Sequence, residues 1–145
     1  MNLKWYYWYF QSVVPEKICD DIIEYGLSQK SQIALTGTGI AKEPPTKKEL
    51  KNIQKKRKSD IVWMSDTWIY KEIQPYIHEA NRSANWNHEW DHSQSCQFTE
   101  YKKGQYYDWH CDANEIPYDE PEDTNQHGKI RKLSMTLSLT DPKEY

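Results

Sequence analysis

The first part of the chain has the pattern of a strand followed by an amphipathic helix. Residues 4–14 are mostly aromatic or β-branched, a composition typical of a pleated strand. Pro15 follows, and proline is well tolerated at the first position of a helix. Isoleucine and leucine then recur at helical spacing as far as about Ser28. The pattern therefore predicts a strand, a helix start at Pro15, and a helix end near Ser28.

A second strand and helix are predicted farther along. Residues 60–64 are mostly apolar and β-branched, and the Ser-Asp pair after them can cap a helix. Apolar residues recur at helical spacing over 68–80. Pro75 lies inside this stretch, which predicts a kink or a break, because proline removes a backbone hydrogen bond. Asparagine-rich residues 81–87 are expected to end the helix.

Residues 30–60 differ in character from both flanks. Glycine and proline interrupt this stretch, and residues 47–58 contain seven lysines or arginines. The simplest interpretation is a solvated loop with a short helix near residues 48–55. The functional alternatives are a mobile loop over an active site, or a basic patch for an acidic partner.

The second half of the chain has strand-like patterns. Residues 95–101, 105–112 and 133–140 are predicted strands, with a Lys-Lys-Gly turn between the first two. A long acidic loop, residues 114–127, separates the second strand from the third. Because helices come first and antiparallel-type strands second, the predicted fold class is α+β.

Composition excludes several classes of protein. No apolar run approaches the ~18 residues of a membrane span, and the first residues lack the pattern of a secretion signal. The net charge of −3 gives no electrostatic case for nucleic-acid binding. Three widely spaced cysteines, Cys19, Cys96 and Cys111, fit free thiols in a reducing compartment. These features predict a single-domain cytoplasmic protein that binds neither membranes nor nucleic acids.

His110 and Asp112 are the strongest candidates for chemistry. They are two residues apart in a predicted strand, so both side chains are expected on the same face. One imidazole nitrogen and one carboxylate oxygen on one face are two corners of the facial triad that holds iron(II). A His-x-Asp pair alone is weak evidence, because it arises often by chance.

The surrounding residues strengthen this interpretation. The chain resembles the prolyl 4-hydroxylase type of iron(II)- and 2-oxoglutarate-dependent dioxygenases, from about Phe10 to Asp141. The motif residues that carry the resemblance are Tyr101, Gly104, Tyr107, His110 and Asp112, then Arg131, Ser134 and the run Ser138-Leu139-Thr140-Asp141-Pro142.

The resemblance implies a role for each matched residue. His110 and Asp112 would bind iron. Tyr101, Ser134 and Ser138 would border the cofactor cavity that holds 2-oxoglutarate, although a half-buried strand with one wet face explains the two serines equally well. Tyr107 would be the catalytic-site residue nearest the peptide. Tyr107 and His110 face opposite sides of a regular strand, so this assignment requires a bulge or bend between them.

The resemblance also implies a fold and a reaction. The fold would be a double-stranded β-helix, or jelly roll, flanked by N-terminal helices. The reaction would use Fe(II), 2-oxoglutarate and O2, with ascorbate as a further cofactor, to hydroxylate a proline-containing peptide or protein. Prolyl 4-hydroxylation is the expected activity, and residues 30–60 would be the lid.

The family's second histidine and the lysine or arginine that binds 2-oxoglutarate would lie beyond Tyr145. A jelly roll needs ~80 residues, whereas about 50 follow Gln94. We therefore expect residues 1–145 to be one domain that is incomplete at the C-terminus, with residues 1–93 preceding the first part of the jelly-roll core at 94–145. Such a fragment would have little or no activity, and a second chain that completes the sheet is the alternative.

Two other functions are left open. A non-catalytic binding module could keep the fold without the reaction. A zinc hydrolase could use His88-Glu89-x-x-His92, a signature that requires a helix to direct both histidines at one ion. Helix formers are scarce there, which favours a polar loop or strand. His127 could replace the third iron ligand, but its acidic loop favours a solvated side chain.

Overall fold

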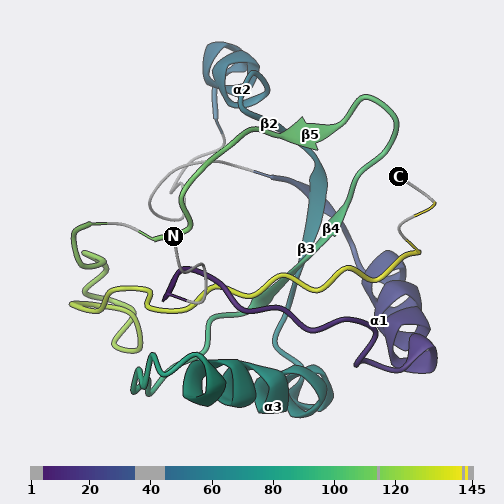
Figure 1. Ribbon diagram of the computed structural model, residues 1–145. Helices are drawn as coiled ribbons and strands as arrows, with labels where there is room; N and C mark the ends of the chain where they lie inside the picture. The colour runs from purple at the N-terminus through teal and green to yellow at the C-terminus, as the bar shows by residue number, and fades with distance from the viewer. Residues whose placement is uncertain (1–4, 35–44, 114, 142, 144–145) are drawn as a thin grey trace. The chain divides into compact units, whose positions relative to one another are not determined.

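The computed structural model describes residues 5–34, 45–113, 115–141 and 143. Its helices and strands are shown in Figure 1. In chain order they are α1 (Glu16–Ser28), β1 (Gln32–Ile33), α2 (Lys47–Ile53), β2 (Arg57–Lys58), β3 (Asp60–Met64), α3 (Thr67–Ser83), β4 (Cys96–Glu100) and β5 (Tyr106–Tyr107). The predicted α+β class is confirmed.

The strands form two small sheets. One sheet has the order β1-β3-β4, and the other pairs β2 with β5. The pairs β1–β3 and β2–β5 are antiparallel, with Arg57 opposite Tyr107 in the second. Within the described residues these sheets stay open and do not close into a barrel.

The chain divides into two compact units. The first consists of residues 1–28, 64–95 and 135–145, and carries α1 and α3. The second consists of residues 29–63 and 96–134, and carries α2, β1, β2, β4, β5 and nearly all of β3. No helix that the structure describes has the length and apolar character needed to cross a membrane.

Aromatic contacts join the two helices of the first unit. The ring of Tyr25 in α1 packs edge-on against Trp68 in α3, with centroids 6.0 Å apart. The Tyr25 hydroxyl donates to the Asp66 carboxylate at 3.0 Å, and this hydrogen bond raises the pKa of Tyr25. Asp66 occupies the N-cap position of α3, but its side chain makes no capping hydrogen bond. Asp66 therefore occupies the predicted cap position, but its side chain binds Tyr25 of α1 instead of capping α3.

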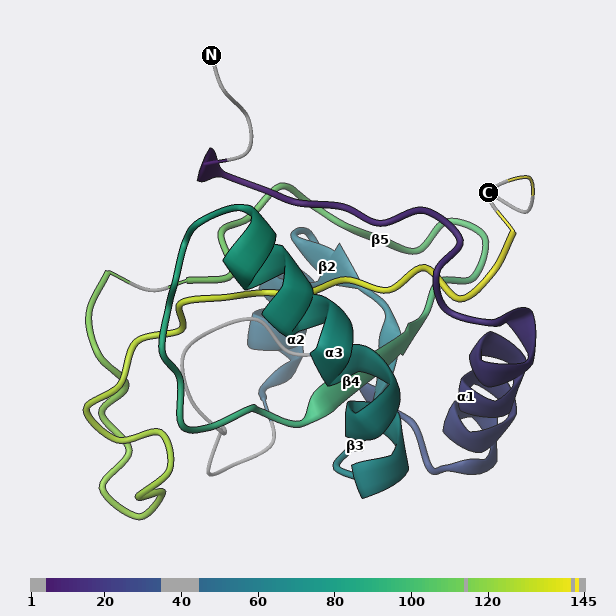
Figure 2. The ribbon, with the colours of Figure 1, turned by 60° about the horizontal axis from the view of Figure 1, so that its bottom comes forward.

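The predicted helices have the expected extents. Helix α1 begins directly after Pro15, whose carbonyl accepts from the backbone N–H groups of Ile18 and Cys19. Helix α3 continues through Pro75 without the predicted break, and Figure 2 shows it as one ribbon. It ends at the asparagine-rich segment, where Asn85 and Asn87 adopt positive φ. Asparagine tolerates this conformation better than most residues, which explains the stop.

The predicted N-terminal strand is wrong for the residues described. Residues 5–14 form no strand, and their aromatic side chains from Trp5 to Phe10 are exposed. Ser12 has a φ of 53°, which interrupts any extended conformation. The carbonyl of Val13 accepts from the Tyr76 hydroxyl at 2.7 Å, so here a side chain supplies the bond that a neighbouring strand would make. High β-propensity alone gives no strand without a partner.

The last predicted strand is also wrong. Residues 133–140 form no hydrogen-bonded strand. Their burial still alternates, since three leucines are half-buried and the serines and threonines are exposed. The alternation follows from extended backbone, whereas a strand also needs a paired neighbour.

In the second unit, β3 supplies much of the core and α2 is capped. Ile61 and Val62 are 4% and 6% exposed.

The predicted short helix is confirmed as α2, which begins with a capping box between Thr46 and Glu49. Gly37, Gly39 and Pro44, the predicted breaks in the candidate lid, lie outside the described residues.

Candidate functional site

The candidate site lies in the second unit, where the chain leaves β5. The strand predicted over residues 105–112 ends at Tyr107, so that prediction is wrong for residues 108–112. Asp108 explains the early end. Its N–H still donates to the Lys56 carbonyl at 2.8 Å, which continues the pairing with β2 by one bond, but its carboxylate accepts from the N–H of Trp109 at 2.8 Å. Such local side-chain bonds to the backbone compete with continuation of a strand.

The bend after Tyr107 brings His110 and Asp112 together. His110 Nε2 lies 3.1 Å from Asp112 Oδ1. His110 Nδ1 lies 2.8 Å from the Asp108 carbonyl oxygen. A carbonyl only accepts, so Nδ1 carries the hydrogen and Nε2 faces the carboxylate. The two side chains share one side, as predicted, through a bend and not through a strand.

His110 Nε2 and Asp112 Oδ1 lie at the distance of a hydrogen bond or ion pair, and the same separation is compatible with two ligands of one metal ion. Two ligand atoms at about 2.1 Å from an ion and at right angles stand about 3.0 Å apart. The observed separation of 3.1 Å agrees. A histidine ligand that donates its second ring N–H to a backbone carbonyl has a fixed tautomer and orientation. Among the described residues, no group of three or more potential ligands could hold a metal ion.

Arg131 and Ser134 donate hydrogen bonds to Asp112. Ser134 Oγ donates to Asp112 Oδ2 at 2.5 Å, and Arg131 Nη1 donates to the Asp112 carbonyl at 2.6 Å. The Ser134 bond occupies Oδ2 and leaves Oδ1 toward His110, while the Arg131 bond holds the backbone of Asp112. An adjoining cavity of about 280 Å³ is lined by residues 111–113 and 131–134. Ser134 thus contacts a candidate metal ligand, while its predicted contact with a cofactor stays a prediction.

Tyr107 packs directly on His110. Their rings are stacked, with centroids 3.6 Å apart and planes 15° from parallel. The bend that the sequence required between Tyr107 and His110 is therefore present. The guanidinium carbon of Arg57 lies 4.3 Å from the centroid of the same tyrosine ring. Two planar groups this close cannot share one face, so the tyrosine lies between the guanidinium and the imidazole.

Arg57 is a site residue whose role the sequence did not reveal. It is 5% exposed, and its Nε donates to Ser59 Oγ at 3.0 Å. Its buried Nη2 atom has no hydrogen-bond partner among the residues that the structure describes. The pairing of β2 with β5 places Arg57 opposite Tyr107. The two are fifty residues apart in sequence, so no local spacing could indicate their contact. The Tyr107 ring provides a cation–π contact for this buried charge.

We expect Tyr107→Ala to weaken metal binding at His110 and Asp112 by about tenfold, the lower end of the effect of losing a residue that orients a ligand. The substitution removes the ring that packs on His110 and leaves Arg57 without its cation–π contact. Tyr107→Phe keeps the ring and should bind metal within about twofold of wild type. Calorimetric titration with Mn(II) measures both. Equal loss in both variants would show that the hydroxyl, and not the stack, matters.

The other predicted cofactor residues are less closely tied to this site. Tyr101 directly follows β4 and is 48% exposed. Ser138 is exposed and belongs to the first unit. His127 was the alternative for the third iron ligand. Its Nδ1 atom lies 3.9 Å from Oδ1 of Asp119 within the acidic loop, and its side chain is half exposed. The cofactor roles of Tyr101 and Ser138 stay predictions.

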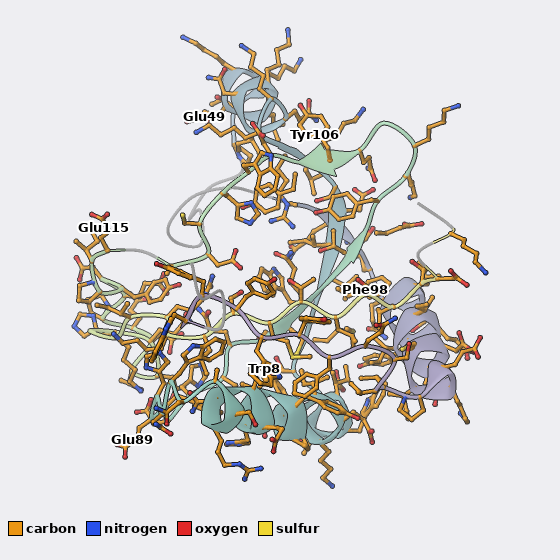
Figure 3. All side chains as sticks on the ribbon, viewed as in Figure 1. Trp8, Glu49, Glu89, Phe98, Tyr106 and Glu115 are labelled. Carbon is orange, nitrogen blue, oxygen red and sulfur yellow. The ribbon has the colours of Figure 1, made fainter. Side chains whose placement is uncertain are left out.

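The His-Glu-x-x-His segment is a loop, as predicted. No helix includes residues 84–95, and Figure 3 shows Glu89 on the coil after α3. Asn81, 8% exposed, fixes this coil: its side chain donates to the His88 carbonyl at 2.8 Å and accepts from the His88 N–H at 3.0 Å. Trp90 stacks on His78. The helix that a zinc hydrolase needs is therefore absent from these described residues.

Comparisons of the chain with models of known protein families, with curated proteins and with solved structures find no match. The similarity of residues 101–112 and 131–141 to the dioxygenase motif accordingly rests on the residues themselves.

Proposed function

We propose that the protein is an iron(II)- and 2-oxoglutarate-dependent dioxygenase that hydroxylates a peptide or protein, with prolyl 4-hydroxylation as the reaction. One observation carries the proposal: His110 Nε2 and Asp112 Oδ1 lie 3.1 Å apart, a separation suited to two ligands of one ion. The motif around them supplies the identity of the metal and co-substrate. When bound, the iron and 2-oxoglutarate would activate O2 for hydroxylation.

The residues of the chain prepare the two ligands for binding. The Asp108 carbonyl holds the Nδ1 hydrogen of His110, which keeps Nε2 available to a metal. Ser134 holds Oδ2 of Asp112, which favours binding through Oδ1 alone. Tyr107 packs on the His110 ring and is held in turn by Arg57.

The proposed fold is the jelly roll of the same enzymes. The antiparallel pairs β1–β3 and β2–β5 support it, because that fold is built from antiparallel strands. On the resemblance, a second histidine and a basic residue for 2-oxoglutarate follow the segment that ends at Asp141. The activity therefore belongs to a protein that includes those residues.

The test is an assay of the full gene product with Fe(II), 2-oxoglutarate and a library of proline-containing peptides. We expect succinate to form only when both iron and 2-oxoglutarate are present, and one peptide to gain the mass of one oxygen atom. Product analysis by mass spectrometry and fragmentation locates the hydroxyl group. His92→Ala is the matched control, since it removes an exposed histidine outside the proposed site.

The results separate the three functions considered. Succinate formation that is abolished by His110→Ala and unaffected by His92→Ala supports the dioxygenase. Peptide binding without any succinate would contradict it and favour a binding module. Loss of bound metal on substitution of His88 or His92 would contradict it in favour of a zinc site.

A further inference from the structure

A dense set of lysines surrounds α2 and β2. We name this set the basic patch; it consists of Lys47, Lys48, Lys51, Lys55, Lys56 and Lys58. All six side chains are exposed. Like charges this close repel one another, so the cluster costs free energy unless an anionic partner offsets it.

The protein itself does little to neutralise the basic patch. Glu49 is the only acidic residue within residues 47–58. Its carboxylate accepts from the N–H and the hydroxyl of Thr46 at 2.7 and 2.6 Å, in the capping box of α2. The Thr46 hydroxyl bond lowers the pKa of Glu49 and commits this carboxylate to the helix end. Among the described residues, none of the ion pairs involves a lysine of the patch.

The basic patch is fixed to the strand that leads into the candidate site. Strand β2 pairs with β5, and the Lys56 carbonyl accepts from the N–H of Asp108 at 2.8 Å. The Tyr106 hydroxyl donates to the Gln54 carbonyl at 2.9 Å. Figure 3 shows Tyr106 on β5 and Glu49 on α2 in this part of the second unit. The backbone that carries the lysines is thus held against the residues that precede His110.

We propose that the basic patch binds an acidic segment of the peptide substrate and thereby selects substrates with glutamate or aspartate next to the target residue. This inference rests on the proposed function, since it assigns the substrate class of the same site. Exposed charges that complement a partner raise the association rate and suppress partners of the wrong charge. Helix α2 is about 10 Å long, which matches three or four residues of an extended peptide.

An acidic peptide fits this surface better than a nucleic acid. The whole chain has a net charge of −3. The second unit also carries an acidic loop with Glu115, Asp119, Glu120, Glu122 and Asp123, drawn apart from α2 in Figures 1 and 2. A long polyanion would extend beyond the basic patch and meet repulsion there, whereas a short acidic segment would not.

The test is fluorescence anisotropy with three labelled peptides, each with a central proline. The first has four glutamates on each side, the second glutamines, and the third lysines. We expect the glutamate peptide to bind at least tenfold more tightly than the other two, and to lose affinity when the salt concentration is raised. A single-stranded oligonucleotide of matched charge is measured in parallel.

Matched triple variants locate the binding surface. Lys47→Gln/Lys51→Gln/Lys55→Gln should weaken binding of the glutamate peptide by about tenfold. Lys30→Gln/Lys71→Gln/Lys103→Gln changes the net charge equally at exposed positions outside the patch, and should change affinity by less than about twofold. Circular dichroism confirms that both variants fold. Equal affinity in the two triple variants would overturn the inference, as would tighter binding of the oligonucleotide than of the peptide.

The same assay separates this inference from the proposed function. His110→Ala/Asp112→Ala should keep its affinity for the glutamate peptide, because these residues lie outside the basic patch. Patch-dependent binding by a full-length protein that forms no succinate would uphold the basic patch and contradict the dioxygenase. Succinate formation that is equally efficient with glutamine and glutamate peptides would support the dioxygenase function and contradict the proposal that the basic patch selects acidic substrates.

Discussion

His110→Ala should lower the affinity of the protein for a divalent metal by at least about a hundredfold. Loss of a residue that merely orients a ligand costs 10–100-fold, so loss of the ligand itself should reach or exceed the upper end of that range. The imidazole supplies one of the two donors at the candidate site, with Nε2 3.1 Å from Asp112 Oδ1. Calorimetric titration with Mn(II), an oxygen-stable substitute for Fe(II), measures the change in dissociation constant.

Two further variants make this prediction specific. Asp112→Asn keeps the shape of the side chain and removes its charge, and it should have a loss similar to that of His110→Ala. His127→Ala removes a half-exposed histidine of the acidic loop, and it should leave the dissociation constant unchanged within about twofold. Metal binding that survives in both His110→Ala and Asp112→Asn would show that the pair is an ordinary surface contact.

Ile61→Ala should lower the free energy of unfolding by about 3 kcal/mol, the usual cost of truncating a buried isoleucine. Ile61 is 4% exposed and lies opposite Gln32 in the β1–β3 pair. The truncation leaves a cavity beside β3. Because small domains are stable by only about 5–15 kcal/mol, the change is large relative to the total. Urea denaturation followed by tryptophan fluorescence measures it through the shift in midpoint.

Ile33→Ala is the matched control for Ile61→Ala. It removes the same atoms from the neighbouring strand β1, at a side chain that is 52% exposed. Its cost should be about 1 kcal/mol or less, since much of the side chain is already in water. If the two truncations cost the same, burial at β3 is not what stabilises this sheet.

The predictions that depended on local pattern agree best with the structure. The helix of residues 16–28 and the strand of residues 60–64 begin and end where their patterns indicate. A short helix near residues 48–55, found as α2, and the turn at Gly104, where φ is 79°, were also predicted. In each case the determining contacts lie within a few residues: a proline at a helix start, a capping box, or a glycine that accepts positive φ.

Apart from the break expected at Pro75, which α3 does not show, the predictions that failed are those of strands. Residues 5–14 and 133–140 have suitable composition or alternation but form no strand in the described residues, and the strand expected over 105–112 ends at Tyr107. Composition indicates that a segment can be extended. Whether it forms a strand depends on a neighbour that supplies backbone hydrogen bonds, and that neighbour comes from elsewhere in the chain.

The candidate site depends both on local sequence spacing and on long-range contacts. His110 and Asp112 could be identified from a spacing of two residues, and the role that the resemblance implies for Tyr107 required a bend, because strand parity placed Tyr107 and His110 on opposite faces. Arg57 and the hydrogen bond of Ser134 to Asp112 could not be identified in this way. The partners of these two contacts are separated by fifty and twenty-two residues, and only the pairing of β2 with β5 and the path of residues 113–134 bring them together. Local sequence therefore determined the helices, the turn and the candidate ligands. Tertiary packing decided which side chains support those ligands, because long-range contacts depend on the fold of the whole chain and not on the spacing of neighbouring residues.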